Sequence, residues 1–289
     1  MNLYEIYELL SYIYFSICIL GLIGNILAFI SFCRKQYRKT IFSTYFRILS
    51  FIDIIVMLTR IDYFLKEFYY NGLRTVSAFF CKLTMYIIYL MPSISSWIMV
   101  LIILDRFLSI VTPSKFLFRK TIKFQLLACG LIAVYNSLIS IDVIVSYKFY
   151  YKSRKNYSVA ICDNKNLSVD LIDNINSSLI PFILMIVLTF FVLKTLFKSR
   201  KVTKQNENNK KDLRFAITSI SLNVSFVLLK FPHDFYSALS NIIDVDENVD
   251  SLIYTILSIM FYSHHGSIFY LTFITNSSFR KDFINSFRF

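Results

Sequence analysis

The chain has 289 residues, of which 56% are hydrophobic and 18% aromatic, and its mean hydropathy is +0.57. Soluble domains are about 45–50% apolar, so this composition argues against an ordinary soluble protein. The formal net charge is +13. The basic residues lie in short loops between apolar runs, which indicates membrane topology rather than nucleic-acid binding.

Seven apolar runs follow one another, each long enough for a membrane-spanning helix. They predict helices over about 9–32, 42–65, 78–111, 122–147, 177–198, 213–239 and 250–274. The first run is too long for a cleaved signal peptide and lacks a basic start, so we expect an uncleaved signal-anchor. The expected fold is an all-α membrane protein: one seven-transmembrane domain over 1–289, with a short cytosolic tail over 276–289.

Basic residues indicate the orientation. Loops 33–47, 112–123 and 194–214 and the tail hold most of the lysines and arginines, whereas the last loop on the other side is acidic. The positive-inside rule then places the N-terminus outside the cell and the C-terminus in the cytosol, at the plasma membrane. Two glycosylation sequons, at Asn156 and Asn166, fall in an expected outer loop. A third, at Asn176, lies close to the fifth helix.

The third apolar segment separates two chemically distinct residues. Cys81 opens it, and Asp105-Arg106-Phe107 closes it 25 residues later. A helix rises about 1.5 Å per residue, so this separation is roughly 37 Å, the thickness of a bilayer core with some tilt. Cys81 and Arg106 are therefore expected at opposite membrane faces.

A series of motifs runs through the helices in order. They are Gly24-Asn25, Leu49 with Asp53, Asp105-Arg106-Phe107, Pro181, Phe226 with Lys230-Phe231-Pro232, and Phe269 to Phe273 followed by Phe279. The ordered set resembles the rhodopsin-like (class A) G-protein-coupled receptors. The stretch from Ser96 to Phe107 is also similar to invertebrate peptide receptors of the FMRFamide type.

The resemblance implies a disulfide between Cys81 and Cys162 on the oxidising side of the membrane; two unpaired thiols are the alternative. It implies that Arg106 pairs with Asp105 at rest and lines the G-protein cavity on activation, although a snorkelling arginine would look the same in sequence. The further switch positions that the resemblance implies are Phe107, Phe226, Lys230, Pro232, Phe269 and Phe273.

Asp53 is a carboxylate in the middle of a helix, where a buried charge needs partners. The resemblance suggests Asn25 and Ser95, around a sodium ion held by Asp53 and Ser95. Phe269 stands where the family has an asparagine and cannot coordinate a cation. His265, one turn earlier, is an alternative partner, and a structural polar cluster is the alternative to a sodium site.

Lys230 occupies the position where the family usually has tryptophan, and Asp234 lies four residues on, within pairing reach on a helix. An opsin is excluded because retinal needs a Schiff-base lysine in the seventh helix, and residues 250–274 contain no lysine. Intramembrane charges and aromatics indicate a ligand pocket, with interhelical ion pairs as the alternative. The candidates are Arg60, Asp62, Tyr86, Tyr89, Lys230, His233, Asp234, Tyr236, Tyr262 and His264.

The predicted function is a receptor that binds an extracellular ligand and activates a heterotrimeric G protein. A short neuropeptide is the expected ligand, since Ile88 replaces the aspartate that marks amine receptors. A small-molecule chemosensory receptor is the alternative, and a transporter is a further one. No enzyme motif is present, and we expect neither a cofactor nor nucleic acid as a partner. The tail alternates Phe with basic residues and predicts a short amphipathic eighth helix on the bilayer.

Overall fold

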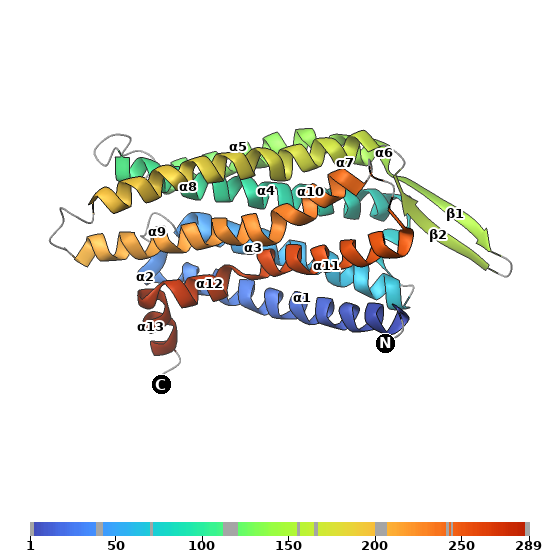
Figure 1. Cartoon of the computed structure of the whole chain (residues 1–289), viewed down its shortest axis with the longest axis horizontal. Coiled ribbons are helices and arrows are strands. Elements are labelled where there is room, and N and C mark those ends of the chain that lie inside the picture. Colours follow the sequence, from blue (N-terminus) through green and yellow to red (C-terminus); the bar gives the residue numbers. More distant parts are fainter. Residues whose placement is uncertain are drawn as a thin grey trace.

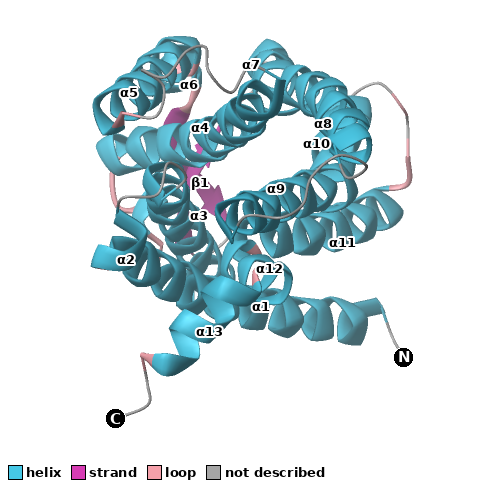
Figure 2. Cartoon of the chain, turned by 90° about the vertical axis from the view of Figure 1, so that its left-hand side faces the viewer, coloured by secondary structure: helices cyan, strands magenta, loops and turns pink. Residues whose placement is uncertain are grey.

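Long helices packed side by side form a bundle in this computed structural model (Figures 1 and 2). The structure describes residues 3–38, 43–69, 72–111, 121–154, 157–164, 167–199, 207–240, 243 and 245–286. Seven rods run along the bundle in the described part of the chain. They are α1 (Leu3–Cys33), α3 (Ser43–Tyr69), α4 (Ala78–Val111), α5 (Ile122–Ile139) with α6 (Ile141–Ser146), α7 (Leu167–Asn174) with η3 (Ile175–Leu179) and α8 (Ile180–Ser199), α9 (Glu207–Ser225) with η4 (Phe226–Lys230) and α10 (Phe231–Ser240), and α11 (Glu247–Gly266) with α12 (Ile268–Thr275).

Shorter elements mark the two ends of the bundle. A hairpin of β1 (Lys148–Arg154) and β2 (Tyr157–Asp163) projects from the end at which the N-terminus lies, close to the single turn η1 (Leu73–Thr75). At the opposite end, α2 (Lys35–Arg38) lies near α13 (Ser277–Asn285), which turns across the rods (Figure 1). The expected seven-helix bundle with a short eighth helix is confirmed, and the hairpin is an addition to it.

The hairpin lies where the sequence predicted a polar outer loop. Its strands pair antiparallel, with Lys148 opposite Asp163 and Phe149 opposite Cys162. β1 contains Phe149, Tyr150 and Tyr151, and β2 contains Tyr157, Val159 and Ile161, residue types that favour the pleated backbone. The three sequons and the many polar residues of 148–176 obscured this pattern.

Several helices extend past the apolar runs that predicted them. The first begins at Leu3 rather than 9, the fifth at Leu167 rather than 177, and the sixth at Glu207 rather than 213. Adding residues to an existing helix costs little compared with nucleating one, so polar turns continue a helix beyond the bilayer. The extension of the fifth rod matters most, because it creates α7.

Two rods contain a π-helical turn just before a proline. The turn η3 precedes Pro181 and the turn η4 precedes Pro232. Proline has no backbone N–H, so it cannot bond the carbonyl four residues earlier, and the helix widens locally. The last rod breaks at Ser267. These interruptions rotate the side chains that follow them.

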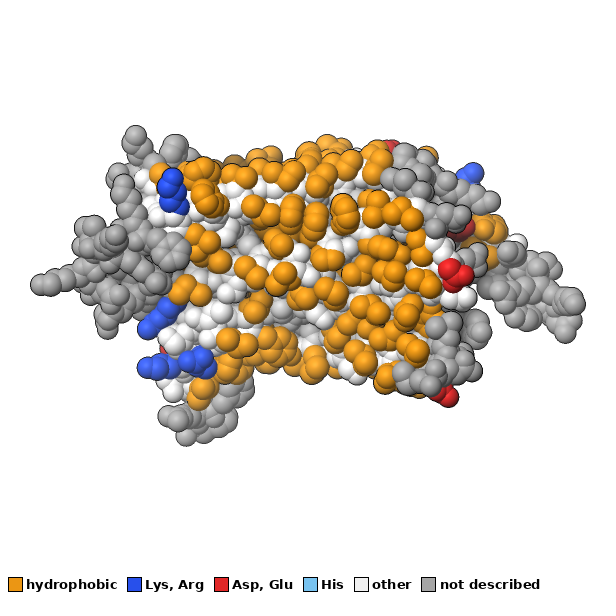
Figure 3. All heavy atoms as spheres, viewed as in Figure 1, with side chains coloured by type: hydrophobic (Ala, Val, Ile, Leu, Met, Phe, Trp, Pro, Cys, Tyr) orange, Lys and Arg blue, Asp and Glu red, His pale blue; other side chains and the backbone are white. Residues whose placement is uncertain are grey.

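The outside of the bundle is apolar along its middle. Among the described residues, five helical segments are long and apolar enough to cross a membrane, namely Glu5–Cys33, Ala78–Ser109, Ile122–Ser146, Val169–Thr195 and Arg214–Ser240. The face drawn in Figure 3 has a continuous hydrophobic belt, with most of its visible Lys and Arg near one end. This surface suits a multi-pass protein in a lipid bilayer.

The eighth helix is held against the bundle by its own cap and by α2. The Asn276 side chain accepts a hydrogen bond from Phe279 N at 3.2 Å and so caps the start of α13. Phe279 is buried and stacks on Phe32, with ring centroids 5.2 Å apart. The Tyr37 hydroxyl donates to Asp282 at 2.5 Å, and burial together with this carboxylate raises the pKa of Tyr37. The hydroxyl therefore stays protonated and keeps donating.

Candidate functional site: a charged cavity under a disulfide-anchored hairpin

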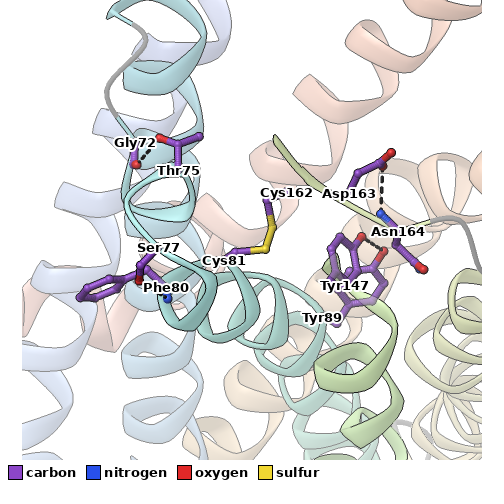
Figure 4. Close-up of a disulfide and its surroundings, with 10 residues drawn as sticks. All are labelled: Gly72, Thr75, Ser77, Phe80, Cys81, Tyr89, Tyr147, Cys162, Asp163 and Asn164. Atoms are coloured by element: carbon purple, nitrogen blue, oxygen red, sulfur yellow. Dashed lines mark hydrogen bonds between the residues drawn. A yellow bond between two sulfur atoms is a disulfide. The ribbon is translucent and has the colours of Figure 1, made fainter. Parts of the chain in front are cut away.

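A disulfide joins Cys81, in the first turn of α4, to Cys162 on β2 (Figure 4). The two Cα atoms are 5.7 Å apart, and the residues lie 81 positions apart in sequence. Cys81 is fully buried and packs with Val143, Tyr147 and Val169. The bond therefore fixes the hairpin over the end of the bundle, as the resemblance implied. Cys18, Cys33 and Cys129 are free.

A cavity of about 250 Å³ lies below this disulfide. Its walls include Ile88 and Tyr89, which are seven and eight residues into α4 from Cys81 and so roughly 10–12 Å deeper. Six of the ten predicted ligand-binding candidates line it, namely Arg60, Tyr89, Lys230, His233, Asp234 and Tyr262.

The other four candidates do not line the cavity, and each has a structural contact of its own. Asp62 accepts a hydrogen bond from Leu73 N at 2.8 Å. The remaining three bond across helices: Tyr86 to Ser137 O at 3.3 Å, Tyr236 to Asp250 at 2.8 Å, and His264 to Ser225 at 3.0 Å. These four residues lie outside this cavity, and their part in ligand binding stays a prediction. Apolar helices give little sign of which face turns inward.

Lys230 forms the floor of the cavity and has no exposed surface. Its Nζ lies 2.6 Å from Asp234 Oδ2 and donates to Ser177 O at 3.2 Å. Ser177 is four residues before Pro181, so the carbonyl lacks its usual α-helical partner. The ammonium also lies 5.3 Å and 5.2 Å from the ring centroids of Phe226 and Phe261. A buried charge is tolerated only with such partners.

His233, on α10, also lines the cavity and faces the seventh rod. Its Nδ1 lies 2.8 Å from Asp234 Oδ1, and its ring lies 4.7 Å from the Phe261 ring. The side chain lies beside Tyr254 as well, with ring centroids 5.1 Å apart. Asp234 therefore has a partner at each carboxylate oxygen, Lys230 at Oδ2 and His233 at Oδ1.

Two further carboxylates in the wall were missed from sequence. Asp170 and Asp173 on α7 both line the cavity. Asp170 accepts a hydrogen bond from the Tyr89 hydroxyl at 2.5 Å, and that hydroxyl lies 2.9 Å from the Tyr147 hydroxyl (the two rings are drawn in Figure 4). A spacing of three residues places both aspartates on one face of a helix. The signal was present, but the segment was not recognised as helical.

The other lining residues are of mixed character. The cationic and polar ones are Arg74, Tyr147, Asn174, Ser177, Ser237 and Tyr254, and the apolar ones are Met85, Ile88, Pro92 and Phe261. Arg60 lies over the Tyr262 ring at 4.6 Å from its centroid. Formal charges of both signs thus meet in one small volume.

Deeper in the bundle, Asp53 is the centre of a buried polar cluster. Its Oδ1 accepts from Ser95 Oγ at 2.9 Å and lies 2.8 Å from His265 Nδ1. Asn25 Nδ2 donates to His265 O at 3.0 Å. His265 thus takes the partner role that the sequence offered as an alternative. The imidazole satisfies the carboxylate oxygen without a cation, and Phe269 adds no ligand. These residues fit a hydrogen-bonded cluster better than a sodium site, and sodium binding by Asp53 and Ser95 remains a prediction.

At the end remote from the disulfide, Arg106 is buried beside the sixth rod. Its guanidinium carbon lies 5.7 Å from the centroid of the Phe215 ring, an arrangement typical of cation–π contact. Asp105 is also buried, and Phe107 lies 5.9 Å from Phe191. Pairing of Arg106 with Asp105 stays a prediction.

The predicted switch positions of the sixth and seventh rods lie within aromatic clusters. Phe226 is fully buried and begins the π turn that ends before Pro232. Phe269 stacks on Phe273 with centroids 5.8 Å apart, and both rings approach Phe283 of α13. Their roles as switches remain predictions.

The sequon residues separate into two groups. Asn156 and Asn166 lie outside the described residues, so their glycosylation stays a prediction. Asn176 is buried: its Nδ2 donates to Ser93 at 3.0 Å and to Asn136 at 2.8 Å. Trp97 donates to the Asn176 carbonyl at 3.1 Å. Asn176 is therefore a structural link between rods.

Comparison with known proteins agrees with this geometry. A model of the 7 transmembrane receptor (rhodopsin family) matches residues 24–266. The chain is also similar to type-1 angiotensin II receptors. It is 23% identical over 251 residues to the receptor of Meleagris gallopavo, 24% over 249 residues to that of Ovis aries, and 23% over 252 residues to the type-1 angiotensin II receptor B of Mus musculus. Each match covers 83% of this chain and 67% of the relative.

The match to the family model extends over most of the bundle, from Gly24 in α1 to Gly266 at the end of α11. It agrees with the helical fold and with the order of the motifs along the rods. The chain belongs to the rhodopsin family of seven-transmembrane receptors.

Proposed function

We propose that this receptor binds a short peptide at the disulfide end of the bundle and activates a heterotrimeric G protein at the Arg106 end. The observation that carries the proposal is the charged cavity below the disulfide-anchored hairpin. A pocket with converging charged and aromatic groups is the default ligand site of a protein. The basic loops support an orientation with this end outside the cell.

Two features support a peptide over a small apolar molecule. The cavity has formal charges of both signs and hydrogen-bonding groups on several rods, which suits peptide side chains and termini. Its volume of about 250 Å³ is below the range usual for drug-sized ligands. One end of a peptide would fit inside, and the remainder would lie along β1 and β2.

The relatives also favour a peptide. Their names give angiotensin II, a peptide, as the ligand of those receptors. At 23–24% identity this resemblance concerns the class of ligand rather than the ligand itself. The resemblance of Ser96–Phe107 to FMRFamide-type receptors points to peptides as well, and a small-molecule chemosensory ligand is the competing outcome.

Activation would proceed through the floor of the cavity. Lys230 joins η4 to η3 through Ser177 O, and to α10 through Asp234. A ligand that contacts this floor differently in two arrangements of the rods shifts the population between them. The rod formed by α9, η4 and α10 also contains Phe215, which lies against Arg106. A change at the cavity thus reaches the end where the G protein would bind.

The test is a screen for G-protein activation in cells that express the chain, with a library of short amidated peptides. Arg106→Ala is the inactive comparison, and Arg34→Ala, a basic residue in the bend after α1, is the matched charge control. A response that is lost in Arg106→Ala and kept in Arg34→Ala supports the proposal. A response only to small organic molecules contradicts the peptide part. Silence to both classes, with normal surface expression, contradicts coupling.

A further inference from the structure

The negative wall of the cavity comes from the fifth rod rather than the third. Asp170 and Asp173 stand on one face of α7 and both line the cavity, whereas the lining residues of α4, namely Met85, Ile88, Tyr89 and Pro92, include no carboxylate. The cavity thus holds three carboxylates: these two and Asp234 on α10. They differ in how completely other groups satisfy them.

Asp173 is the least satisfied of the three. Asp234 has Lys230 at 2.6 Å and His233 at 2.8 Å, and Asp170 accepts from the Tyr89 hydroxyl at 2.5 Å. The one hydrogen bond that Asp173 makes among the described residues is from Ser177 Oγ, at 3.4 Å. That distance is long for O–H···O, and a carboxylate offers about four lone-pair sites. Asp173 therefore keeps most of its acceptor capacity.

His233 provides a second, independent observation. Only 9% of the residue is exposed, yet its Nε2 has no hydrogen-bond partner among the described residues. The Nδ1 lies 2.8 Å from Asp234 Oδ1, and a carboxylate paired with Lys230 can only accept, so Nδ1 carries the proton. In the neutral ring, Nε2 is then an acceptor. A buried acceptor without a donor is costly, and a ligand can relieve that cost.

The cations in the same wall do not fill this role. Lys230 has no exposed surface and is held by Asp234, by the Ser177 carbonyl and by two aromatic rings. Arg60 belongs to α3 and lies over the Tyr262 ring at 4.6 Å. Three cations, Arg60, Arg74 and Lys230, line the cavity, yet none of them forms an ion pair with Asp173 among the described residues.

We propose that the ligand of this receptor carries a guanidinium or a primary ammonium, with Asp173 as its counter-ion and His233 Nε2 as a further acceptor. The inference rests on the proposed function, since it takes the cavity to be the ligand site. A guanidinium has five N–H donors and an ammonium has three, so either supplies donors to both acceptors. A volume of about 250 Å³ admits one such side chain.

The test uses thermal unfolding of the purified receptor in lipid nanodiscs, with two small probes. N-acetyl-L-argininamide carries the guanidinium, and N-acetyl-L-citrullinamide has nearly the same shape without charge. At about ten times its Kd, the arginine probe is expected to raise the unfolding midpoint by about 2 °C. The citrulline probe is expected to leave the midpoint unchanged.

Three variants assign the effect to the carboxylate. Asp173→Asn is expected to lose the response to the arginine probe, and Asp173→Glu, which restores the charge, to retain it. Asp142→Asn removes the same charge from an exposed position on α6 outside the cavity and is expected to respond like the parent. If Asp173→Asn does not fold, Asp173→Ser replaces it in the comparison.

Equal stabilisation by both probes, no stabilisation by the arginine probe up to 50 mM, or a full response in Asp173→Asn would each overturn the inference. The measurement needs no G protein. A receptor that binds the arginine probe but never signals therefore contradicts the proposed function and not this inference. A receptor that signals without the charge preference contradicts the inference alone.

Discussion

Asp234 is predicted to be essential for stability because it neutralises a lysine that is almost fully buried. Lys230 Nζ lies 2.6 Å from Asp234 Oδ2, and the two side chains are 1% and 7% exposed. Removing one partner of a buried ion pair costs about 3–5 kcal/mol, because the remaining charge stays in a medium that solvates it poorly. In Asp234→Asn the ammonium keeps the Ser177 carbonyl and two rings, so we expect the lower end, about 3 kcal/mol.

Two companion variants test whether the cost comes from breaking the ion pair or from changing either residue by itself. Lys230→Met leaves Asp234 with His233 as a partner, so its expected cost is smaller, about 1–2 kcal/mol. The double variant Lys230→Met with Asp234→Asn removes both charges and keeps the volume, and is expected to be within about 1 kcal/mol of the parent. The two single effects should therefore not add.

The assay follows thiol labelling on heating. Cys18 and Cys129 are buried, with 1% and 6% of their surface exposed, and react when the bundle unfolds, whereas exposed Cys33 gives a constant background. A loss of about 3 kcal/mol corresponds to a midpoint about 5 °C lower. An Asp234→Asn midpoint within about 1 °C of the parent, or additive effects in the double variant, would refute the reasoning.

Substitutions at the disulfide, at two glycines and at Asn176 have expected outcomes in the same assay. Cys81→Ser and Cys162→Ser should each destabilise the protein by about 2–4 kcal/mol, and their combination should cost no more than either alone. Gly266→Ala should lower the midpoint, because its Cβ would lie 2.9 Å from the Gly21 Cα where α11 meets α1; Gly130→Ala, where nothing lies within 4 Å, should be neutral or stabilising by up to about 1 kcal/mol. Asn176→Ala should cost about 1–3 kcal/mol, because its partners on α4 and α5 lose their hydrogen bonds. For each variant expected to destabilise the protein, an unchanged midpoint would contradict the reason given for it.

Local rules explain what could be predicted from sequence. Lys230 and Asp234 are one helical turn apart, so their pairing follows from spacing and from the cost of burying a charge. His265 was offered as a partner for Asp53 because the usual asparagine position holds Phe269. The His265–Asp53 contact, at 2.8 Å, joins residues 212 positions apart in sequence. Only the order of the motifs along the helices indicated that these two residues lie close together.

The remaining features depend on rotation and on long-range contacts. A helix that is apolar all round gives no periodic signal for its inward face, and this is why the sequence could not place Tyr86, Tyr236 and His264 relative to the cavity. The hairpin owes its position to the Cys81 disulfide. Asp173 was missed for a related reason, since it belongs to a polar helical turn beyond the apolar run.

The central claim is that ligand binding at the disulfide end drives nucleotide exchange at the Arg106 end. The most direct measurement is guanine-nucleotide exchange on purified heterotrimeric G proteins by the receptor in nanodiscs, with and without peptides, for the parent, Arg106→Ala and Asp173→Asn. A basic peptide is expected to stimulate exchange in the parent, to have no effect in Arg106→Ala, and to act with lower potency in Asp173→Asn. Exchange that is unchanged in Arg106→Ala, or absent with every peptide and every G protein tested, would contradict it.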